Sequence, residues 1–331
     1  MKRLLFFLVL LWPGTLLADF QTAVDAYNRG DYAIAYSEFL PLAEQGDASA
    51  QFNVGLMYDN GEGVPRDDAE AVRWYRLAAE QEFAKAQFNL GLMYDNGEGV
   101  PEDDAEAVKW YRLAAEQGDV FAQSNLALMY YNGEGVPLDY AEAVTWYRLA
   151  AEQGDVFAQF NLGLMYDNGV GVPQDYAEAV TWYRLAAEQE FAKAQFNLGR
   201  IYDNGEGVPE DDAEAVKWYR LAAEQGNADA QFNLGRMYNN GEGVPLDYAE
   251  AVKQFRLAAE QGNAAAQLNL GRTYYDGWDV PQDYVTAYAW FNLAAAQGNE
   301  RAAKNKDMVQ ESMTPAQVAE GQKLSRELSK R

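Results

Sequence analysis

The chain has 331 residues, of which 49% are apolar, so it can bury a large core. It contains neither cysteine nor histidine, which excludes disulfides, thiolate or imidazole catalysis, and zinc or haem ligation through those side chains. Its formal net charge is −25, and a surface of that sign repels nucleic-acid phosphates and anionic lipids, so neither is an expected partner.

Residues 1–18 have the pattern of an export signal. Lys2 and Arg3 precede an apolar run over residues 4–12, and a small residue, Ala18, stands at the expected cut. The run is too short to span a bilayer, so we expect no membrane insertion after cleavage. The alternative is an uncleaved anchor, because a large side chain stands two residues before the cut. We predict a periplasmic or secreted chain in which 24 basic residues remain against 51 acidic ones, a net charge of −27.

Residues 19–46 are predicted to form a helical hairpin, with helices over 20–28 and 32–45. After it, residues 47–298 consist of seven copies of a 36-residue unit. The string Asn-Gly-Glu-Gly-Val-Pro or a variant of it recurs at this interval, with its first glycine at Gly61, Gly97, Gly133, Gly169, Gly205, Gly241 and Gly277. So short a unit buries its apolar face only against copies of itself, so we predict a helical stack.

Each unit is predicted to contain two helices joined by a glycine-rich loop. In the first unit, small or apolar residues at Ala50, Val54 and Met57 have helical spacing and predict a first helix, helix A, over 47–60. The Asn-Gly pair ends helix A, and Pro65 prevents it from resuming. The loops lack the alternating oxygen ligands of a calcium site, because Val-Pro follows at once, so we interpret them as turns and expect no metal.

The second helix of each unit, helix B, begins at a pair of carboxylates. Asp67 is expected to cap it, and Glu70 is expected to reach back to the start of the helix in a capping box. The later pairs are Asp103/Glu106, Asp139/Glu142, Asp175/Glu178, Asp211/Glu214 and Asp247/Glu250. Two carboxylates are also the minimum for glycosidase chemistry. A catalytic pair is expected once, in one odd unit, so the repetition favours capping.

Residues 299–331 are predicted to form two helices that cap the far end of the stack. The second follows a capping box at 314–317, and its basic end is expected to fold against the acidic body. Both ends of a stack must be sealed, because a terminal unit exposes the apolar stripe meant for a neighbour. With the front hairpin, these helices bring the predicted number to eighteen.

The recurring residues resemble those of the Sel-1-like repeat family. They are Ala50, Val54-Gly55, Tyr58, the Gly61-x-Gly63-Val64 loop, Ala71, Trp74-Tyr75 and Ala78-Ala79. The resemblance implies an all-α, right-handed α-solenoid of seven helix-loop-helix repeats with helical caps at both ends. It also implies a non-enzymatic adaptor with no cofactor and no catalytic residue. A cysteine-rich subgroup associated with β-lactam binding depends on a disulfide in each repeat, and this chain departs from it.

Comparison of the seven units separates constant positions from variable ones. The tyrosine of the Tyr58 position never varies, and the tryptophan of the Trp74 position is missing only at Gln254, so both positions are assigned to the core. The Gly55 position is expected to let helices A and B approach closely. The arginine at the Arg76 position is expected to pair with a glutamate on its own helix.

In solenoids of this type the concave wall is made by helices A, and the resemblance implies that a partner binds there. One predicted contact series is a phenylalanine ladder: Phe52, Phe88, Phe160, Phe196 and Phe232. The other series changes from leucine to arginine: Leu56, Leu92, Leu128, Leu164, Arg200, Arg236 and Arg272. The aligned arginines predict a groove that is apolar in its first half and binds carboxylates in its second. The alternative is that each arginine pairs with a neighbouring aspartate.

We therefore predict a monomeric scaffold that binds a protein or peptide, with carboxylate groups of the partner at the C-terminal half of the groove. An envelope assembly factor that organises a complex is the second class. A cell-wall or β-lactam-related enzyme is the third, and the absence of any nucleophile motif argues against it.

Overall fold

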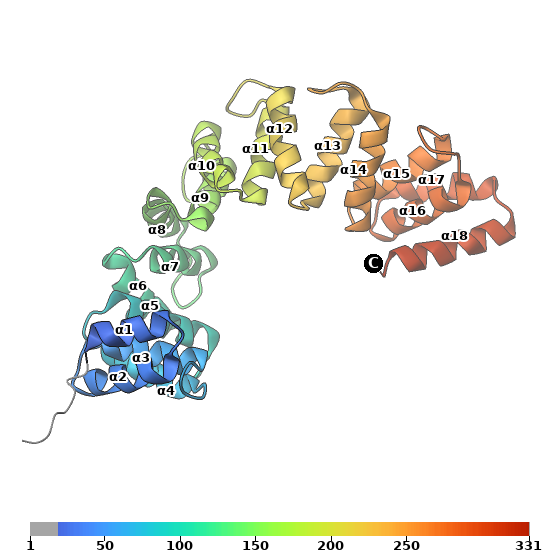
Figure 1. Ribbon diagram of the computed structural model, residues 1–331. Coiled ribbons are helices and arrows are strands. Elements are labelled where there is room, and N and C mark those ends of the chain that lie inside the picture. The colour runs from blue at the N-terminus through green and yellow to red at the C-terminus, as the bar shows by residue number, and fades with distance from the viewer. Residues whose placement is uncertain (1–18, 331) are drawn as a thin grey trace, which may run out of the picture. The chain divides into compact units, whose positions relative to one another are not determined.

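The computed structural model describes residues 19–330, which form eighteen α-helices and no strand, as the repeat pattern predicts (Figure 1). The expected signal segment at residues 1–18 lies outside the described residues. The chain divides into two compact units between Leu149 and Ala150, within helix α8.

The first unit begins with the capping hairpin and continues through the first repeats. Its helices are α1 (Phe20–Asn28), α2 (Tyr32–Glu44), α3 (Ala48–Asn60), α4 (Asp68–Ala79), α5 (Ala84–Asn96), α6 (Asp104–Glu116), α7 (Val120–Asn132) and the start of α8 (Tyr140–Glu152). From α1 to α7, each helix packs against the next in the chain. Odd-numbered helices from α3 to α15 are helices A, and even-numbered helices from α4 to α16 are helices B.

The second unit contains the remaining repeats and the terminal cap. Its helices are α9 (Val156–Asn168), α10 (Tyr176–Glu188), α11 (Ala192–Asn204), α12 (Asp212–Glu224), α13 (Ala228–Asn240), α14 (Tyr248–Glu260), α15 (Ala264–Asp276), α16 (Tyr284–Ala296), α17 (Glu300–Glu311) and α18 (Pro315–Leu328). Helices α17 and α18 both pack against α16, so the last helix folds back on the repeats as expected.

The helix ends follow from the sequence, with one correction. Asp67 caps α4 by accepting hydrogen bonds from the backbone N–H groups of Ala69 and Glu70, as predicted. The carboxylate of Glu70 does not complete a box and instead accepts from Arg73 Nε at 2.9 Å. It lies one turn from a cation of its own helix, and an ion pair there competes with the backbone contact. The full capping box predicted at 314–317 is present.

Close contact between helices A and B depends on the glycine of the Gly55 position. A Cβ atom added to Gly55 would lie 2.7 Å from Cδ1 of Tyr75, which is fully buried on helix B. The same contact recurs in later repeats, for example between Gly199 and Tyr219. A larger residue would push the two helices apart, which confirms the predicted role of this position.

Two kinds of polar contact recur between consecutive repeats. The buried Gln87 donates to the carbonyl of Ala79 in the preceding repeat at 3.1 Å and accepts from Gln117 of its own repeat at 2.7 Å. Arg76 donates to the hydroxyl of Tyr94 in the following repeat at 2.6 Å. The predicted pairing of Arg76 with a glutamate of its own helix is therefore wrong, because the neighbouring repeat offers a less exposed acceptor.

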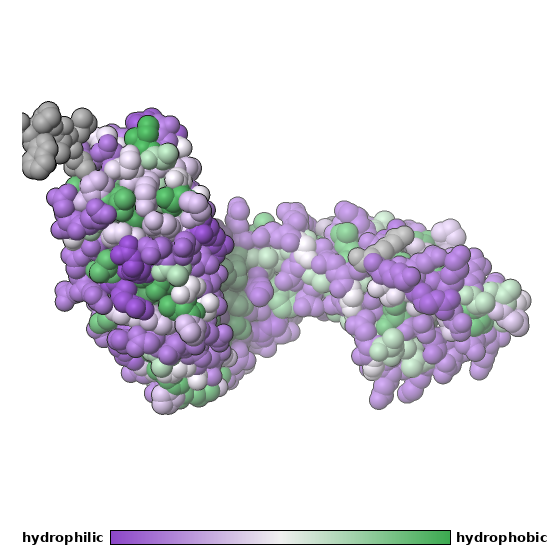
Figure 2. All heavy atoms as spheres, turned by 90° about the horizontal axis from the view of Figure 1, so that it is seen from below, coloured by the Kyte–Doolittle hydropathy of each residue, from purple (hydrophilic) through white to green (hydrophobic). Residues whose placement is uncertain are grey.

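On the face shown in Figure 2, hydrophilic residues cover most of each unit, and hydrophobic residues form scattered spots. Between residues 19 and 330, no helix combines the length and the apolar character that a bilayer crossing requires.

Candidate binding wall on the first helices of the repeats

The predicted contact residues lie on helices A, and we call the surface they form the helix-A wall. It consists of the Phe52 series, the Leu56–Arg272 series, the residue three positions after each member of the latter, and the loop residue six positions after it.

The phenylalanines of the wall are half-buried and belong partly to the core. Each packs one face against the aromatic ring that follows the tryptophan position on helix B of the same repeat, with ring centroids 5.9 to 6.0 Å apart. Phe52 also contacts Phe83 at 5.3 Å, and Phe160 contacts Phe191 at 5.1 Å. The Phe52 series therefore offers a partner only part of its ring surface.

Two exposed phenylalanine rings lie outside the predicted contact series. Phe121 is 62% exposed beside Phe88, and Phe157 is 59% exposed beside Phe191. Both stand one residue after the first position of a helix A, where the other repeats carry serine, lysine, aspartate or alanine. That exception is visible in the sequence once the units are aligned.

In the first unit the second series is apolar. Leu56 and Leu92 are half-buried, and Leu128 is 44% exposed. Near them, the carboxylate of Asp59 accepts from the hydroxyl of Tyr75 at 3.0 Å, and that of Asp95 accepts from the hydroxyl of Tyr111 at 2.9 Å.

In the second unit, Arg200 lies between two carboxylates. Its Nη2 contacts Asp167 of the preceding repeat, and its Nη1 contacts Glu206 in the loop of its own repeat. The hydroxyl of Tyr183 donates to the same Asp167 at 3.1 Å. Burial lowers the pKa of Arg200, but the two carboxylates outweigh it, so this pKa lies above its ordinary value.

The next repeat has the same arrangement. Arg236 contacts Asp203 of the preceding repeat and Glu242 of its own loop, the latter at 3.0 Å, and the hydroxyl of Tyr219 donates to Asp203. Burial, and then the charge of Asp203, raises the pKa of Tyr219 well above its ordinary value. Pairing with a neighbouring aspartate thus describes Arg200 and Arg236, whose guanidinium groups are engaged inside the chain.

Arg272 differs from the other two arginines. The preceding repeat offers Asn239 in place of the aspartate, and its own loop offers Trp278 in place of the glutamate. Arg272 is exposed, and within residues 19–330 it makes no ion pair or side-chain hydrogen bond. Trp278 is 50% exposed. The wall of the last repeat therefore presents an uncompensated cation and an indole to solvent.

The sequence contained the signal for this difference. The predicted series places Arg272 with the other arginines. Comparison of the seven units at the Asp59 and Glu62 positions shows that, of the three arginines, only Arg272 lacks both carboxylate partners. The tyrosine hydroxyl is lost there too, because Phe255 replaces it. Within the described part of the chain, no three acidic side chains are grouped so as to hold a metal ion.

The architecture defines a helical repeat solenoid whose wall carries aromatic, apolar and charged side chains. The Sel1 repeat model matches seven consecutive segments, residues 48–83, 84–119, 120–155, 156–191, 192–227, 228–263 and 264–299. The chain belongs to the Sel1 repeat family. We number the repeats one to seven in this order. Sel1 repeat proteins are in general non-enzymatic scaffolds for protein interaction.

Two solved structures are similar over most of the chain. A protective antigen present in uropathogenic Escherichia coli strains, which displays an SLR fold, is 32% identical with a TM-score of 0.62, and the match covers 93% of this chain and 83% of that one. A Sel1 repeat protein from Oxalobacter formigenes is 38% identical with a TM-score of 0.62, covering 72% of this chain and 95% of that one.

A shorter match links the chain to a curated protein. DAP3-binding cell death enhancer 1 of Rattus norvegicus is 47% identical over 45 residues, which are 14% of this chain and 9% of that protein. The chain thus matches less than a tenth of that relative.

Proposed function

We propose that this protein is an exported, non-enzymatic and monomeric scaffold that binds a protein or peptide through the helix-A wall, with Arg272 as the group that holds a carboxylate of the partner. The observation that carries the proposal is the contrast among the three arginines. Arg200 and Arg236 each contact two carboxylates of the chain, whereas Arg272 has lost both.

The guanidinium of Arg272 favours an anionic group at this place. Arg272 is exposed and forms no ion pair within the described residues, although the chain as a whole has a net charge of −25. A guanidinium binds a carboxylate through two parallel hydrogen bonds, which fixes its orientation as well as its position. Trp278 adds apolar area, and tryptophan and arginine are the residues that most often dominate binding energy at interfaces.

Arg200 and Arg236 are poor candidates for the same task. A partner carboxylate would have to displace Asp167 or Asp203 from its arginine and leave that aspartate unpaired among half-buried groups. Breaking the internal ion pair costs free energy, and the new ion pair with the partner would only offset that cost. Little net binding free energy would remain. We therefore assign these two arginines to the joining of repeats.

The wall of the first unit supports a second, apolar contact region. Leu56, Leu92 and Leu128 line it, and Phe121 adds an exposed ring. Scattered apolar side chains of this kind suit leucine or aromatic residues of a bound protein. We propose that these side chains contribute apolar contact area to the interface, whereas Arg272 fixes the orientation of the partner.

A peptide library tests the binding proposal. Residues 19–331 would be used to select from a library of random peptides with free C-terminal carboxylates, and we expect enrichment of aspartate, glutamate or the terminal carboxylate. The variant Arg272→Gln should bind the selected peptides at least tenfold more weakly, about 1.4 kcal/mol. The control Arg326→Gln makes the same charge change at an exposed position on α18 and should leave affinity unchanged. Equal loss in both variants, or no enrichment, would contradict the proposal.

Export is the other part of the proposal, and the pattern of residues 1–18 supports it. The similar protein of uropathogenic Escherichia coli is a protective antigen, which agrees with an exported role. Fractionation of a bacterial host that expresses the chain with and without residues 1–18 is the test. We expect a shortened product in the periplasm or medium only when the segment is present. An unprocessed product that stays in the cytoplasm would rule export out.

A further inference from the structure

The tryptophan position of helix B closes the core between consecutive helices B in most repeats. Trp74, Trp110 and Trp290 each belong to the buried cluster formed by the preceding pair of helices. The cluster of α12 and α13, which runs from Ala215 to Met237, contains no such ring, because repeat six has Gln254 at this position.

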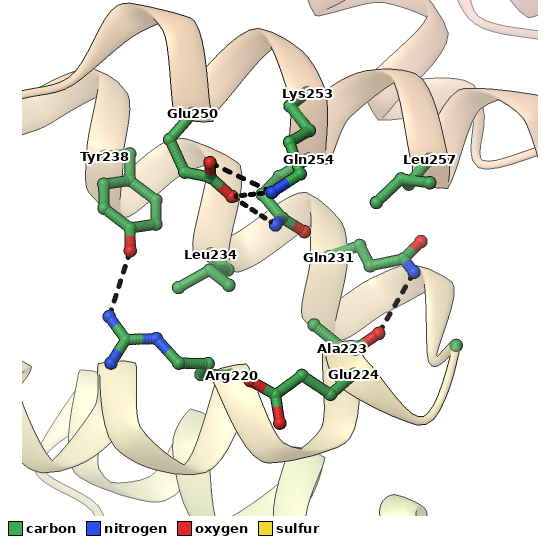
Figure 3. A pocket seen from close by; sticks show the side chains of 11 residues that line it. Arg220, Ala223, Glu224, Gln231, Leu234, Tyr238, Glu250, Lys253, Gln254 and Leu257 are labelled. Atoms are coloured by element: carbon green, nitrogen blue, oxygen red, sulfur yellow. Dashed lines mark hydrogen bonds and ion pairs between the residues drawn. The ribbon is translucent and has the colours of Figure 1, made fainter.

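A pocket of about 390 Å³ lies where that indole would be (Figure 3). Helices α12, α13 and α14 surround it. Figure 3 shows Leu234 and Leu257 as its apolar lining, Arg220 bonded to Tyr238 at one side, and Glu250 bonded to Lys253 and Gln254 at another. Leu257 and Lys253 are exposed, so the pocket is reached from the outer side of the helices B.

Gln254 carries an unsatisfied acceptor at this pocket. Its side chain is only 8% exposed, and its Nε2 donates to Glu250 at 2.8 Å. Its Oε1 is buried and has no hydrogen-bond partner. A buried acceptor without a donor is costly, and a ligand that supplies an N–H group would remove that cost.

Two other repeats show how this environment holds an indole. In repeat two, the Nε1 of Trp110 donates to Glu106 at 3.2 Å, and Lys109 lies 5.1 Å from the ring centroid. In repeat five the corresponding distances are 3.1 and 4.8 Å. Repeat six keeps the glutamate and the lysine as Glu250 and Lys253 and lacks only the ring.

We propose that this pocket binds an indole ring supplied from outside the chain. The ring would pack between Leu234 and Leu257, its face would lie against the ammonium group of Lys253, and its N–H would donate to Oε1 of Gln254. A tryptophan side chain of a partner protein and a small indole compound share this chemistry. The site uses helices B, so it is independent of the helix-A wall.

Fluorine NMR with 5-fluoroindole as the probe tests the site in residues 19–331. We expect saturable broadening or a shift of the probe signal with the wild-type chain and its loss in Gln254→Trp, because the new side chain fills the pocket. That variant should also melt at a higher temperature, which shows that it folds. Arg272→Gln should bind the probe normally, which separates this site from the wall.

Two further probes define the ligand. N-Methyl-5-fluoroindole lacks the donor and should bind about three to ten times more weakly, as expected for the loss of one hydrogen bond. A short peptide with one central 5-fluorotryptophan should bind more tightly than the free indole if a protein is the source, and more weakly if a small compound is. Binding that persists in Gln254→Trp, or no binding by any probe to the wild type, would overturn the proposal. Equal affinity of the methylated probe would overturn the role of Gln254.

Discussion

Repeats five and six have the same helix lengths and the same loop length, but they differ in the side chains that pack between repeats. In repeat five, Asp203 binds both Tyr219 and an arginine, and Trp218 closes the core. Repeat six has Asn239 and Gln254 at two of these positions, without any change in the helix bounds. The comparison shows that the small residues, the helix caps and the loop glycines maintain the fold. The tryptophan and the aspartate can be replaced in a single repeat, which leaves a pocket at Gln254 and, within residues 19–330, an unpaired arginine at Arg272.

The largest effect is expected when repeat five is given the core of repeat six. Trp218→Gln removes a buried ring and should lower the free energy of unfolding by about 3–5 kcal/mol. Denaturant unfolding would measure the change, and amide hydrogen exchange in α10, α11 and α12 would localise it. The reverse change, Gln254→Trp, should raise stability. A loss below about 1 kcal/mol would show that the indole is not part of the core.

The next largest effect concerns the ion pair between repeats. Asp203→Asn removes the charge beside Arg236 and should cost about 2 kcal/mol, less than for a fully buried pair because the side chain of Arg236 is 35% exposed. Asp95→Asn is the matched control, since Leu128 stands at the arginine position of the next repeat and no ion pair is lost there. Thermal unfolding of the two variants compares them. Equal destabilisation would contradict a structural role for the arginine pair.

The contribution to stability at alkaline pH should differ between repeats five and six. The pKa of Tyr219 is raised in the folded state by burial and then by Asp203, so the folded chain keeps a proton that the unfolded chain loses above about pH 10. This stabilisation is present below pH 10, and above it each such tyrosine reduces stability by about 1.4 kcal/mol per pH unit. Tyr219→Phe imitates Phe255 and should lose less stability than the wild type between pH 9 and 11. Identical alkaline losses would refute the assignment.

The smallest effect on stability is expected from restoring a partner to Arg272. Asn239→Asp recreates the aspartate of repeat five and should change the free energy of unfolding by no more than about 1 kcal/mol, because Arg272 is exposed. It should nevertheless weaken the binding of acidic peptides, since the new carboxylate competes for the guanidinium. Titration of a library-selected peptide measures this. Unchanged affinity would mean that Arg272 does not contact the peptide carboxylate.

Much of the fold could be predicted because each local sequence pattern recurs in every repeat at the same interval. The glycine of the Gly55 position and the cap at Asp67 recur in phase, so helix ends and close contacts were visible before the structure. The pairing of Arg200 was not determined by the sequence, because its partner Asp167 lies in the preceding repeat and not one helical turn away. The replacement of tryptophan by Gln254 is evident in the sequence. The pocket could not be predicted from it, because a pocket forms only where no neighbouring side chain fills the space.

Site-specific photocrosslinking tests the central claim most directly. A benzophenone amino acid would replace Trp278 on the helix-A wall or Leu185, an exposed residue on a helix B, in two otherwise identical chains. With a library-selected acidic peptide, we expect crosslinks from position 278 and none from position 185. Crosslinks from position 185 alone would show that the partner binds the outer helices, and the wall would lose its assigned function.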